Sequence, residues 1–533
     1  MTATAKPRRS KSSKAVGPSR SAKLGQPRYI GKPAGIIQHR VQAVGPSKFG
    51  IISVDCAKQR SKWFLCNFFG KVIIEPTVVE HNAGALHNMA SLAMAACREA
   101  GFVDSIAAVE MTGIYHRPVQ NALRKAGFDT RLVHPYASKH YQQRIHPNDK
   151  NDDKDEEAIF LAAINGFGLA TFPVDEAHAS LQVVARHRRN LVKHRSSLQV
   201  QIRCLIHQCM PGFADQFQLD KLFSGSVAMP IAKQFSSAQA IRQAGVDGMA
   251  KYLKLEKVRF QRPTLERIFA WARNAAEPAE MAHLLSVQWK QLARLRDLLT
   301  EQIAKTEGEM AKFLVKTPYV LLLSVTGINV VSAATFAGEA GPIEHYASDS
   351  ALKGRAGLYP RRYQSDSVDI QTSLARNCNR RLRSAALMIA ENLIKCHSHY
   401  RGIAQVLKAQ KVHPRDRKCR IANRAMRMIY QLVAGKKVWH DRSVDREYIL
   451  YKLREFHREH HTPATQAVED LREAITWLPK SAYRSEAQPL LELTRKRKQG
   501  VQPLGDLLLP LLIRLGVTAE KIVESESSEA RKS

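Results

Sequence analysis

Acidic residues are scarce in this 533-residue sequence, because 48 Asp and Glu stand against 82 Lys and Arg and leave a formal net charge of +34 at pH 7. An excess this large goes beyond what solubility requires, and it favours a polyanionic partner. Nucleic acid is the commonest such partner of a strongly basic protein. A ribosome-associated protein and a protein bound to a membrane surface are the alternative interpretations.

Long apolar runs and paired cysteines are also missing. No stretch reaches about 18 uninterrupted apolar residues, so we expect no membrane span. The basic start of the chain has no apolar core behind it, so we do not expect a secretory signal. The eight cysteines form no CxxC pair, which argues against a disulfide framework or a cysteine zinc site and favours a reducing, cytoplasmic location. The histidines His457, His460 and His461 in the run HREHH could bind a metal, but a solvated helix face is the preferred interpretation.

The first part of the chain changes from a basic tail to an α/β pattern. Residues 1–47 contain no acid and many Lys, Arg, Pro, Gly and Ser, which predicts a flexible tail. The apolar runs FGIISVD, KWFLCNF and KVIIEPT then predict three strands in series. SIAAVE and DTRLVHP predict two more strands that alternate with helices. This order predicts an α/β domain with a mixed sheet, as in a ribonuclease-H-like fold.

The rest of the chain is predicted to be all-α. Residues about 178–210 and 281–315 have apolar positions at heptad-like spacing, which indicates an antiparallel helical arm or a coiled coil between subunits. The segment between them gives no assignment. A compact helical domain is expected over about 318–440. Its opening, an apolar helix on each side of Gly327, resembles a helix-hairpin-helix, a motif whose turn often binds phosphate.

Four acids occupy positions where a metal site is expected. Asp55 and Glu110 each end an apolar strand, at the rim of a sheet where ligands usually bind. Asp152 and Asp155 are three residues apart at a helix start and share a face. Two Mg²⁺ ions held by these carboxylates would align a phosphodiester. The alternative is that Asp152 and Asp155 are ordinary N-terminal helix acids and that Asp55 only caps its strand.

Ser365 lies in a segment crowded with arginines, where guanidinium groups could neutralise the oxyanion of a phosphate under attack. No general base is evident nearby, so a polar loop beside a DNA-contacting helix is the alternative. The expected nucleic-acid-binding residues flank this serine on both sides; they are Arg361, Arg362, Arg376, Arg380, Arg381 and Arg383.

These segments together resemble the DEDD transposases of the IS110 family of insertion sequences, over about residues 48–440. The first part of the resemblance rests on the motifs IISVDCAK, IAAVEMTGIY, VHPYASKH and KNDDKDEEA. The second part rests on LLLSVTGINVVSAATFAGEAG, AGLYPRRYQSDS and RNCNRRLRSAALMIA. The sequence departs from the family pattern at Asn151, Glu156, Asp366 and Cys378, where threonine, alanine, glycine and glycine are usual.

The resemblance implies a transposase that cleaves and rejoins DNA. Its RuvC-like domain would bind Mg²⁺ or Mn²⁺ through Asp55, Glu110, Asp152 and Asp155. Its second domain would link a serine covalently to DNA, and the register of QSDS makes that serine Ser365. Family members are similar in using a structured guide RNA that pairs with donor and target DNA. They act as homodimers that join into tetramers. Because the substrate is DNA and no membrane span is expected, we expect a nucleoid-associated protein without membrane contact.

On this basis five segments are expected: a basic tail at 1–47, a RuvC-like DEDD domain at 48–175, a helical coiled-coil arm with an insertion at 176–316, a helical transposase domain with the serine at 317–440, and a charged extension at 441–533.

Two other functions compete with recombination. One is a RuvC-like endonuclease that hydrolyses branched DNA without a serine. The other is a non-enzymatic nucleic-acid scaffold, against which the complete acid set argues.

Overall fold

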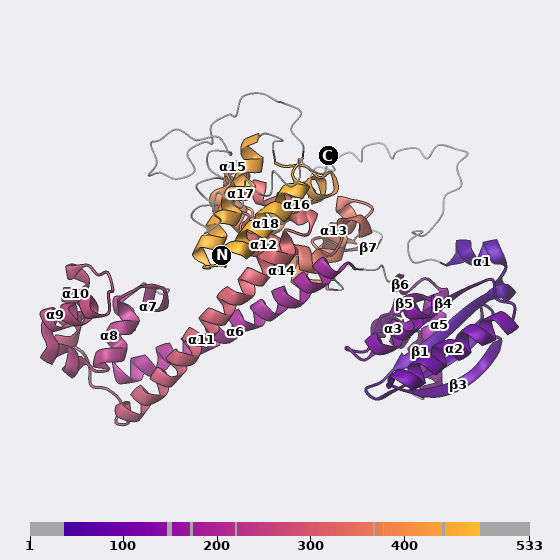
Figure 1. Cartoon of the computed structure of the whole chain (residues 1–533), viewed down its shortest axis with the longest axis horizontal. Coiled ribbons are helices and arrows are strands. Elements are labelled where there is room, and N and C mark those ends of the chain that lie inside the picture. The colour runs from indigo at the N-terminus through magenta and orange to yellow at the C-terminus, as the bar shows by residue number, and fades with distance from the viewer. Residues whose placement is uncertain are drawn as a thin grey trace, which may run out of the picture. The chain divides into compact units, whose positions relative to one another are not determined.

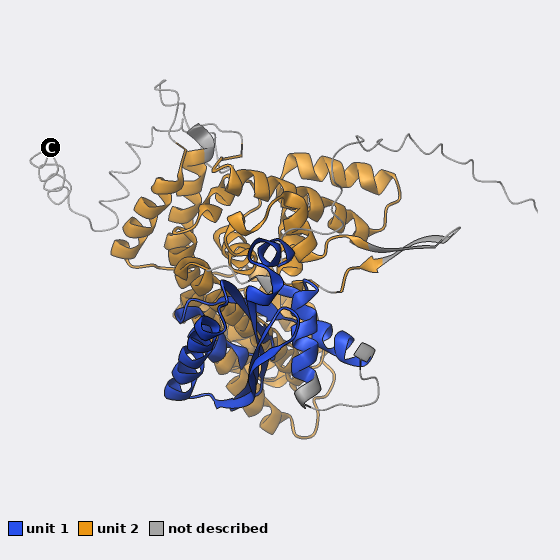
Figure 2. Cartoon of the chain, turned by 90° about the vertical axis from the view of Figure 1, so that its right-hand side faces the viewer, with its two compact units in different colours: residues 1–173 blue, residues 174–533 orange. Residues whose placement is uncertain are grey.

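The computed structural model describes residues 37–145, 152–170, 174–218, 221–365, 368–376, 378–439 and 443–479. The chain divides into two compact units, residues 1–173 and 174–533 (Figure 2). Most of the predicted basic tail and the end of the predicted C-terminal extension lie outside the described residues. The finer division into five segments stays a prediction.

Unit 1 is built on a six-stranded mixed sheet with the order β3-β2-β1-β4-β5-β6. β1 pairs antiparallel with β2 and parallel with β4, and β6 closes the other edge antiparallel to β5. The mixed α/β domain expected from the sequence is therefore confirmed, and its layout is consistent with a ribonuclease-H-like fold. The strands are β1 (Phe49–Cys56), β2 (Arg60–Asn67), β3 (Val72–Glu80), β4 (Asp104–Glu110), β5 (Asp129–Val133) and β6 (Gly168–Ala170).

Helices cover both faces of this sheet (Figure 1). α2 (Ala83–Glu99) and α3 (His116–Lys125) pack on the face that carries Val54 and Val109. α4 (Pro135–Ile145) and α5 (Asp152–Ile164) contribute to the core on the opposite face. The strands read as nearly continuous apolar runs because both of their faces are buried. α4 and the three-residue strand β6 were not predicted.

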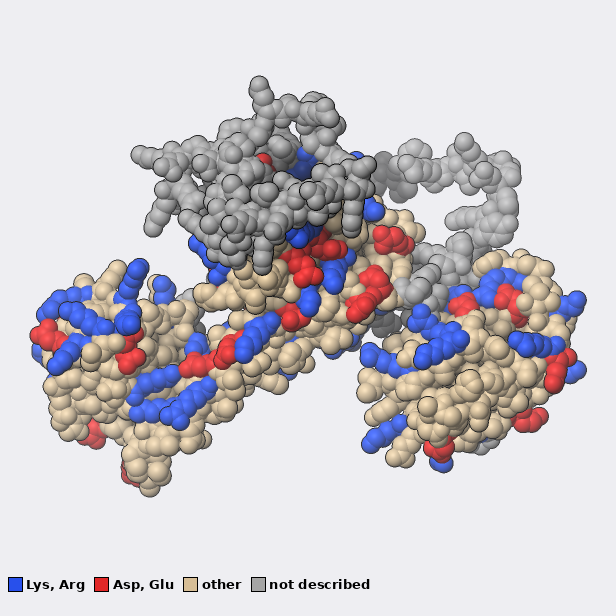
Figure 3. Space-filling view, in the orientation of Figure 1, with Lys and Arg blue, Asp and Glu red and all other residues tan. Residues whose placement is uncertain are grey.

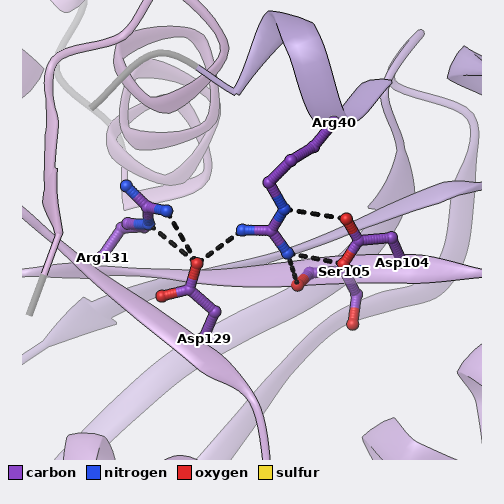
Figure 4. Close-up of polar contacts among 5 residues, drawn as sticks. All are labelled: Arg40, Asp104, Ser105, Asp129 and Arg131. Carbon is purple, nitrogen blue, oxygen red and sulfur yellow. Dashed lines mark hydrogen bonds and ion pairs between the residues drawn. The ribbon is translucent and has the colours of Figure 1, made fainter. Parts of the chain in front are cut away.

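A short helix, α1 (Gln38–Val44), is fixed to the sheet by Arg40 (Figure 4). The Arg40 guanidinium donates to Asp104 Oδ2 at 2.8 Å and to Asp129 Oδ2 at 2.5 Å, and Arg131 Nη2 lies 2.7 Å from the same Asp129 oxygen. These hydrogen bonds hold the pKa of Asp104 below its usual value, against the effect of burial. Asp104 and Asp129 begin the parallel strands β4 and β5, so α1 is held at the edge of the sheet opposite the strand ends Asp55 and Glu110.

Replacing Arg40 with Met should lower the free energy of unfolding of unit 1 by about 1–3 kcal/mol, because two half-buried carboxylates lose their shared cation. Urea denaturation measures this loss, with Arg98→Met at an exposed arginine as the matched control. The lowered pKa of Asp104 stabilises the fold above its unfolded-state pKa, and this contribution is lost as pH falls through the folded-state pKa. Arg40→Met should therefore flatten the acid limb of the pH–stability curve, and an unchanged curve would contradict this role.

Unit 2 contains an arm of two long helices, α6 (Glu176–Cys209) and α11 (Ala282–Leu314), which lie side by side (Figure 1). They run antiparallel, because Arg188 early in α6 binds Glu307 late in α11, and Cys209 at the end of α6 donates to the carbonyl of Ala282. The antiparallel helices expected from the sequence are present. Coiled-coil packing, within the arm or between subunits, stays a prediction.

The segment between the two arm helices forms a small helical cluster with its own core. Phe213, Ile231 and Leu265 are fully buried there, together with Trp289 of α11. The cluster therefore closes on the far end of the arm. Its helices are η2 (Ala214–Gln216), α7 (Lys221–Ser224), α8 (Ala228–Phe235), α9 (Ala238–Leu255) and α10 (Arg262–Arg273).

The main body of unit 2 packs around a core that includes Tyr319, Phe336 and Ile429. α12 lies so close to α6 that a Cβ at Gly338 would come within 2.8 Å of the backbone nitrogen of Gln182. The elements are η3 (Pro318–Ser324), α12 (Val330–Ala340), η4 (Ile343–His345), α13 (Asp349–Ala356), β7 (Pro360–Ser365), β8 (Val368–Leu374), α14 (Arg380–Cys396), α15 (Ser398–Ala409), α16 (Pro414–Ala434), α17 (Ser443–Glu459) and α18 (Ala464–Trp477). None of the described helices is long and apolar enough to cross a membrane.

The apolar segment before Gly327 is helical, and its helix is of the 3₁₀ type. One sequence-based expectation for unit 2 is wrong. His457 and His460 are not on a solvated helix face. His457 is 3% exposed beside Asp470, and His460 Nε2 lies 2.8 Å from Glu307 of the arm. The polar residues next to these histidines in the sequence gave no sign of burial. Their packing partners, Asp470 and Glu307, lie elsewhere along the chain.

Candidate active site

Asp55 and Glu110 lie next to each other where β1 and β4 end. The two strands are parallel, and the last pair of their register sets Val54 opposite Val109. The following residues, Asp55 and Glu110, are therefore neighbours across the strands. Because side chains alternate along a strand and the two valines face α2 and α3, both acids point to the face covered by α5.

The surroundings of these two acids agree with this placement. Burial raises the pKa of the Cys56 thiol to about 12, and the charges of Asp55 and Glu110 add to the effect. Both carboxylates are therefore close to the end of β1. The Glu110 carboxylate accepts hydrogen bonds from Ser138 Oγ of α4 and Thr112 Oγ1, which fix its orientation.

α5 is held against β1 close to these acids. Ser53 Oγ, which is buried, donates to the backbone carbonyl of Glu156 at 3.0 Å. Lys62 stands opposite Asp55 in the β1–β2 register, and its Nζ lies 3.9 Å from Oε1 of the buried Glu156. The first turns of α5, which carry Asp152 and Asp155, therefore lie along the end of β1.

The four predicted acids thus come from elements that meet on one face of the sheet. Their carboxylate oxygens are ligands that Mg²⁺ and Mn²⁺ prefer, so the donor set fits a divalent ion. Among the side chains that the structure describes, no group of three or more His, Cys, Asp or Glu is close enough to hold a metal. The Asp152 side chain lies outside the described residues, and the four-carboxylate site stays a prediction.

Ser365 ends β7 in a two-stranded antiparallel hairpin that the sequence did not predict. It stands opposite Val368 of β8, the last pair before the turn. Arg361 and Arg362 belong to the same strand. The side chains of residues 361–372 lie outside the described residues. The backbone places the serine near the tip of a ribbon.

The arginines that follow the hairpin have two different environments. Arg376, Arg380 and Arg381 are exposed at the end of β8 and the start of α14. Arg383 instead donates to the backbone carbonyls of Ala356, Gly357 and Ala375. Arg383 therefore joins the end of α13 to the base of the hairpin.

Asn379 connects this hairpin base to the arm. Its side-chain oxygen caps α14 by accepting from the backbone of Arg381 and Leu382, and its Nδ2 donates to Glu339 of α12. Glu339 also accepts from Arg186 of α6 at 2.8 Å. Burial alone would raise the pKa of Glu339, but the hydrogen bonds from Arg186 and Asn379 hold it below its usual value.

The turn between η3 and α12 is braced from the C-terminal part of the chain. Lys452 Nζ of α17 donates to the carbonyls of Val325 at 2.7 Å and Ile328 at 2.8 Å, and it lies 4.2 Å from the centre of the Tyr448 ring. A Cβ at Gly327, whose φ is +94°, would come within 3.1 Å of the Asn392 carbonyl oxygen. Lys452 and the α14 backbone together fix the turn that resembles a helix-hairpin-helix.

Replacing Lys452 with Met keeps the length of the side chain but removes the donor from two carbonyls. We expect unfolding of unit 2 to become easier by about 1–3 kcal/mol in urea, with Lys408→Met as an exposed control. Burial lowers the pKa of Lys452 to about 7, so between pH 7 and about 10 the unfolded state binds more protons than the folded state. Wild-type stability should rise over this range, and this rise should be absent in Lys452→Met. An identical pH profile for both proteins would refute the assignment.

Two family models match the chain. One is described as a transposase, of the DEDD type of IS110, and matches residues 52–211; the other is described as transposase IS116/IS110/IS902 family and matches residues 319–405. No curated protein matches the chain. The two matches define an enzyme that cleaves or recombines DNA. The chain belongs to the IS110 family of transposases.

The first match contains the four acids, and the second contains Ser365 and the arginines around it. The helical cluster at the far end of the arm lies largely outside both matches, and α11, α16, α17 and α18 lie entirely outside them. Lys452, which braces the turn at Gly327, therefore lies outside the matched segments.

Proposed function

We propose that this transposase cleaves and rejoins DNA through a covalent link between Ser365 and a DNA phosphate, with Asp55, Glu110, Asp152 and Asp155 holding divalent metal. The observation that supports it most is the parallel register of β1 and β4. This register brings Asp55 beside Glu110 on the face where α5 begins. A random pair of surface acids would not be expected at two adjacent strand ends in a chain of net charge +34.

The metal part of the proposal is supported by hydrogen bonds that position the acidic residues. Ser138 and Thr112 orient the Glu110 carboxylate, and Ser53 holds the backbone of α5 at the end of β1. A bound divalent ion would neutralise phosphate charge and stabilise the entering and leaving oxygens. The residues of the chain set the position of that charge before DNA arrives, which lowers the cost of organising the site.

The serine part of the proposal is a transesterification. The Ser365 Oγ forms a bond to phosphorus and loses its proton to solvent, and the bond from phosphorus to one DNA ester oxygen breaks. That oxygen takes up a proton and leaves as a hydroxyl group. The phosphoserine ester keeps the bond energy for rejoining. Arg361, Arg362, Arg376, Arg380 and Arg381 are the proposed phosphate contacts. Arg383 is proposed to support them by holding the hairpin base.

The partners are proposed from the charge and from the family. Lys and Arg are spread over the visible face of both units (Figure 3), which suits contact with donor and target DNA and with a structured guide RNA. We propose that dimers, joining into tetramers, combine the acids of one subunit with Ser365 of another. A metal-dependent endonuclease that uses water and no serine is the second candidate, because unit 1 holds all four acids by itself.

Replacing Asp55 with Asn or Glu110 with Gln should abolish strand cleavage, by at least about a hundredfold, while DNA affinity stays within a factor of about two. Calorimetric titration with Mn²⁺ gives a readout that does not depend on activity, and both variants should bind the ion more weakly. Glu75→Gln, at an exposed acid of β3, is the control. Full cleavage and unchanged Mn²⁺ binding in the variants would exclude the site.

Incubation with cognate DNA should leave a protease-sensitive protein–DNA adduct on a denaturing gel, and Ser365→Ala should leave none. Ser367→Ala is the matched control, because it removes a hydroxyl two residues away. An adduct that persists in Ser365→Ala and disappears in Ser367→Ala would move the nucleophile to Ser367. Efficient cleavage by wild type without any adduct would favour the hydrolytic endonuclease.

A further inference from the structure

A basic groove runs between α15 and α16 in the main body of unit 2. It consists of two adjoining hollows of about 610 and 500 Å³, and both are lined by His399 and Arg424. Arg420 lines the first hollow and Arg427 the second, so α16 forms one rim along the whole groove. α16 lies beyond the segments that match the family models, and the proposed reaction gives it no role.

The rim has a positive charge that is only partly compensated. Arg420, Arg424 and Arg427 recur at i, i+4 and i+7 and therefore share one exposed face of α16. No acid is among the described residues that line the groove. Arg427 forms one long ion pair, with its Nε 3.9 Å from Asp349 Oδ2, and its side chain is 68% exposed. Arg420 and Arg424 form no ion pair with any residue in the described parts of the chain.

The floor of the groove is apolar and aromatic. Ile403, Val406 and Leu407 of α15 line the first hollow, and Val406 is 58% exposed. Trp439, which is half-buried, lines the second hollow, and Tyr400 lies beneath it at 3% exposure. An arginine rim beside such a floor suits a strand that places its phosphates on the arginines and its unstacked bases on the floor. Duplex DNA offers no free base face to a surface of this kind, because its bases are stacked in the helix.

We propose that this groove binds single-stranded DNA. This inference rests on the proposed function in one respect, which is that the substrate is DNA. Strand cleavage would release single-stranded ends that must be held until they are rejoined. From Arg420 to Gln431 the rim extends 11 residues, or roughly 16 Å at 1.5 Å per residue. This is the length of about five stacked nucleotides at 3.4 Å each.

The test is equilibrium binding of the full chain to a fluorescent oligothymidine of about 20 nucleotides, over a range of salt concentrations. Arg420→Ala combined with Arg424→Ala should weaken binding about tenfold. It should also reduce the log–log salt slope by roughly 1.4, because each lost phosphate contact on a single strand changes the slope by about 0.7. Arg415→Ala, an exposed arginine on the other side of α16, is the matched control and should bind as wild type does.

Val406→Asp provides a second variant, because it places a negative charge on the exposed floor and leaves the arginines intact. It should weaken oligothymidine binding by a similar factor. A duplex of the same length should lose less than threefold in either variant. An equal loss in Arg415→Ala, no loss in the double variant, or a loss confined to duplex or to RNA would each overturn the proposal. The assay involves no cleavage, so its outcome is independent of Ser365 and of the metal site.

Discussion

The parallel pairing of β1 with β4 is the constraint on which the account of this transposase depends. Backbone hydrogen bonds fix the register, and the register makes Asp55 and Glu110 neighbours. A shift of one residue in either strand would turn its acid to the opposite face, among the apolar side chains under α2 and α3. The hydrogen bonds of Ser53 and Glu110 also depend on this register. Ser53 bonds to α5 and Glu110 to α4, and both helices lie on the face to which the two side chains point.

In unit 2 the main structural requirement is that a two-stranded ribbon is held at its base. A ribbon of two strands has little stability of its own. Arg383 secures the base of the ribbon to α13, and Asn379 connects it through the buried Glu339 to Arg186 of the arm. Hydrogen bonds thus connect the long helix α6 through Glu339 to Asn379, which lies five residues after the end of β8. The braced turn at Gly327 belongs to the same body, and its support comes from α17, beyond the matched segments.

Local patterns predicted the elements whose partners are close in sequence. The apolar runs identified five strands of unit 1, and heptad-like spacing identified both arm helices, within two residues of their ends. The cluster at 210–281 could not be assigned, because its apolar positions are shared between short helices and the distant Trp289. The ribbon at Ser365 was missed because its strands are polar and it is held by Arg383. The four acids and Ser365 were selected from the sequence by position and by resemblance, and the structure adds the register that relates Asp55 to Glu110.

The central claim is that the acids of unit 1 and the serine of unit 2 act on one phosphodiester. The most direct measurement is the yield of the covalent protein–DNA adduct as a function of divalent-ion concentration, with cognate DNA and saturating protein. The account predicts no adduct in a chelator, a yield that rises with Mg²⁺ or Mn²⁺, and a loss of this response in Asp55→Asn. An adduct that forms at full yield in the chelator, or equally in Asp55→Asn, would show that the serine works without the acids and would contradict the account.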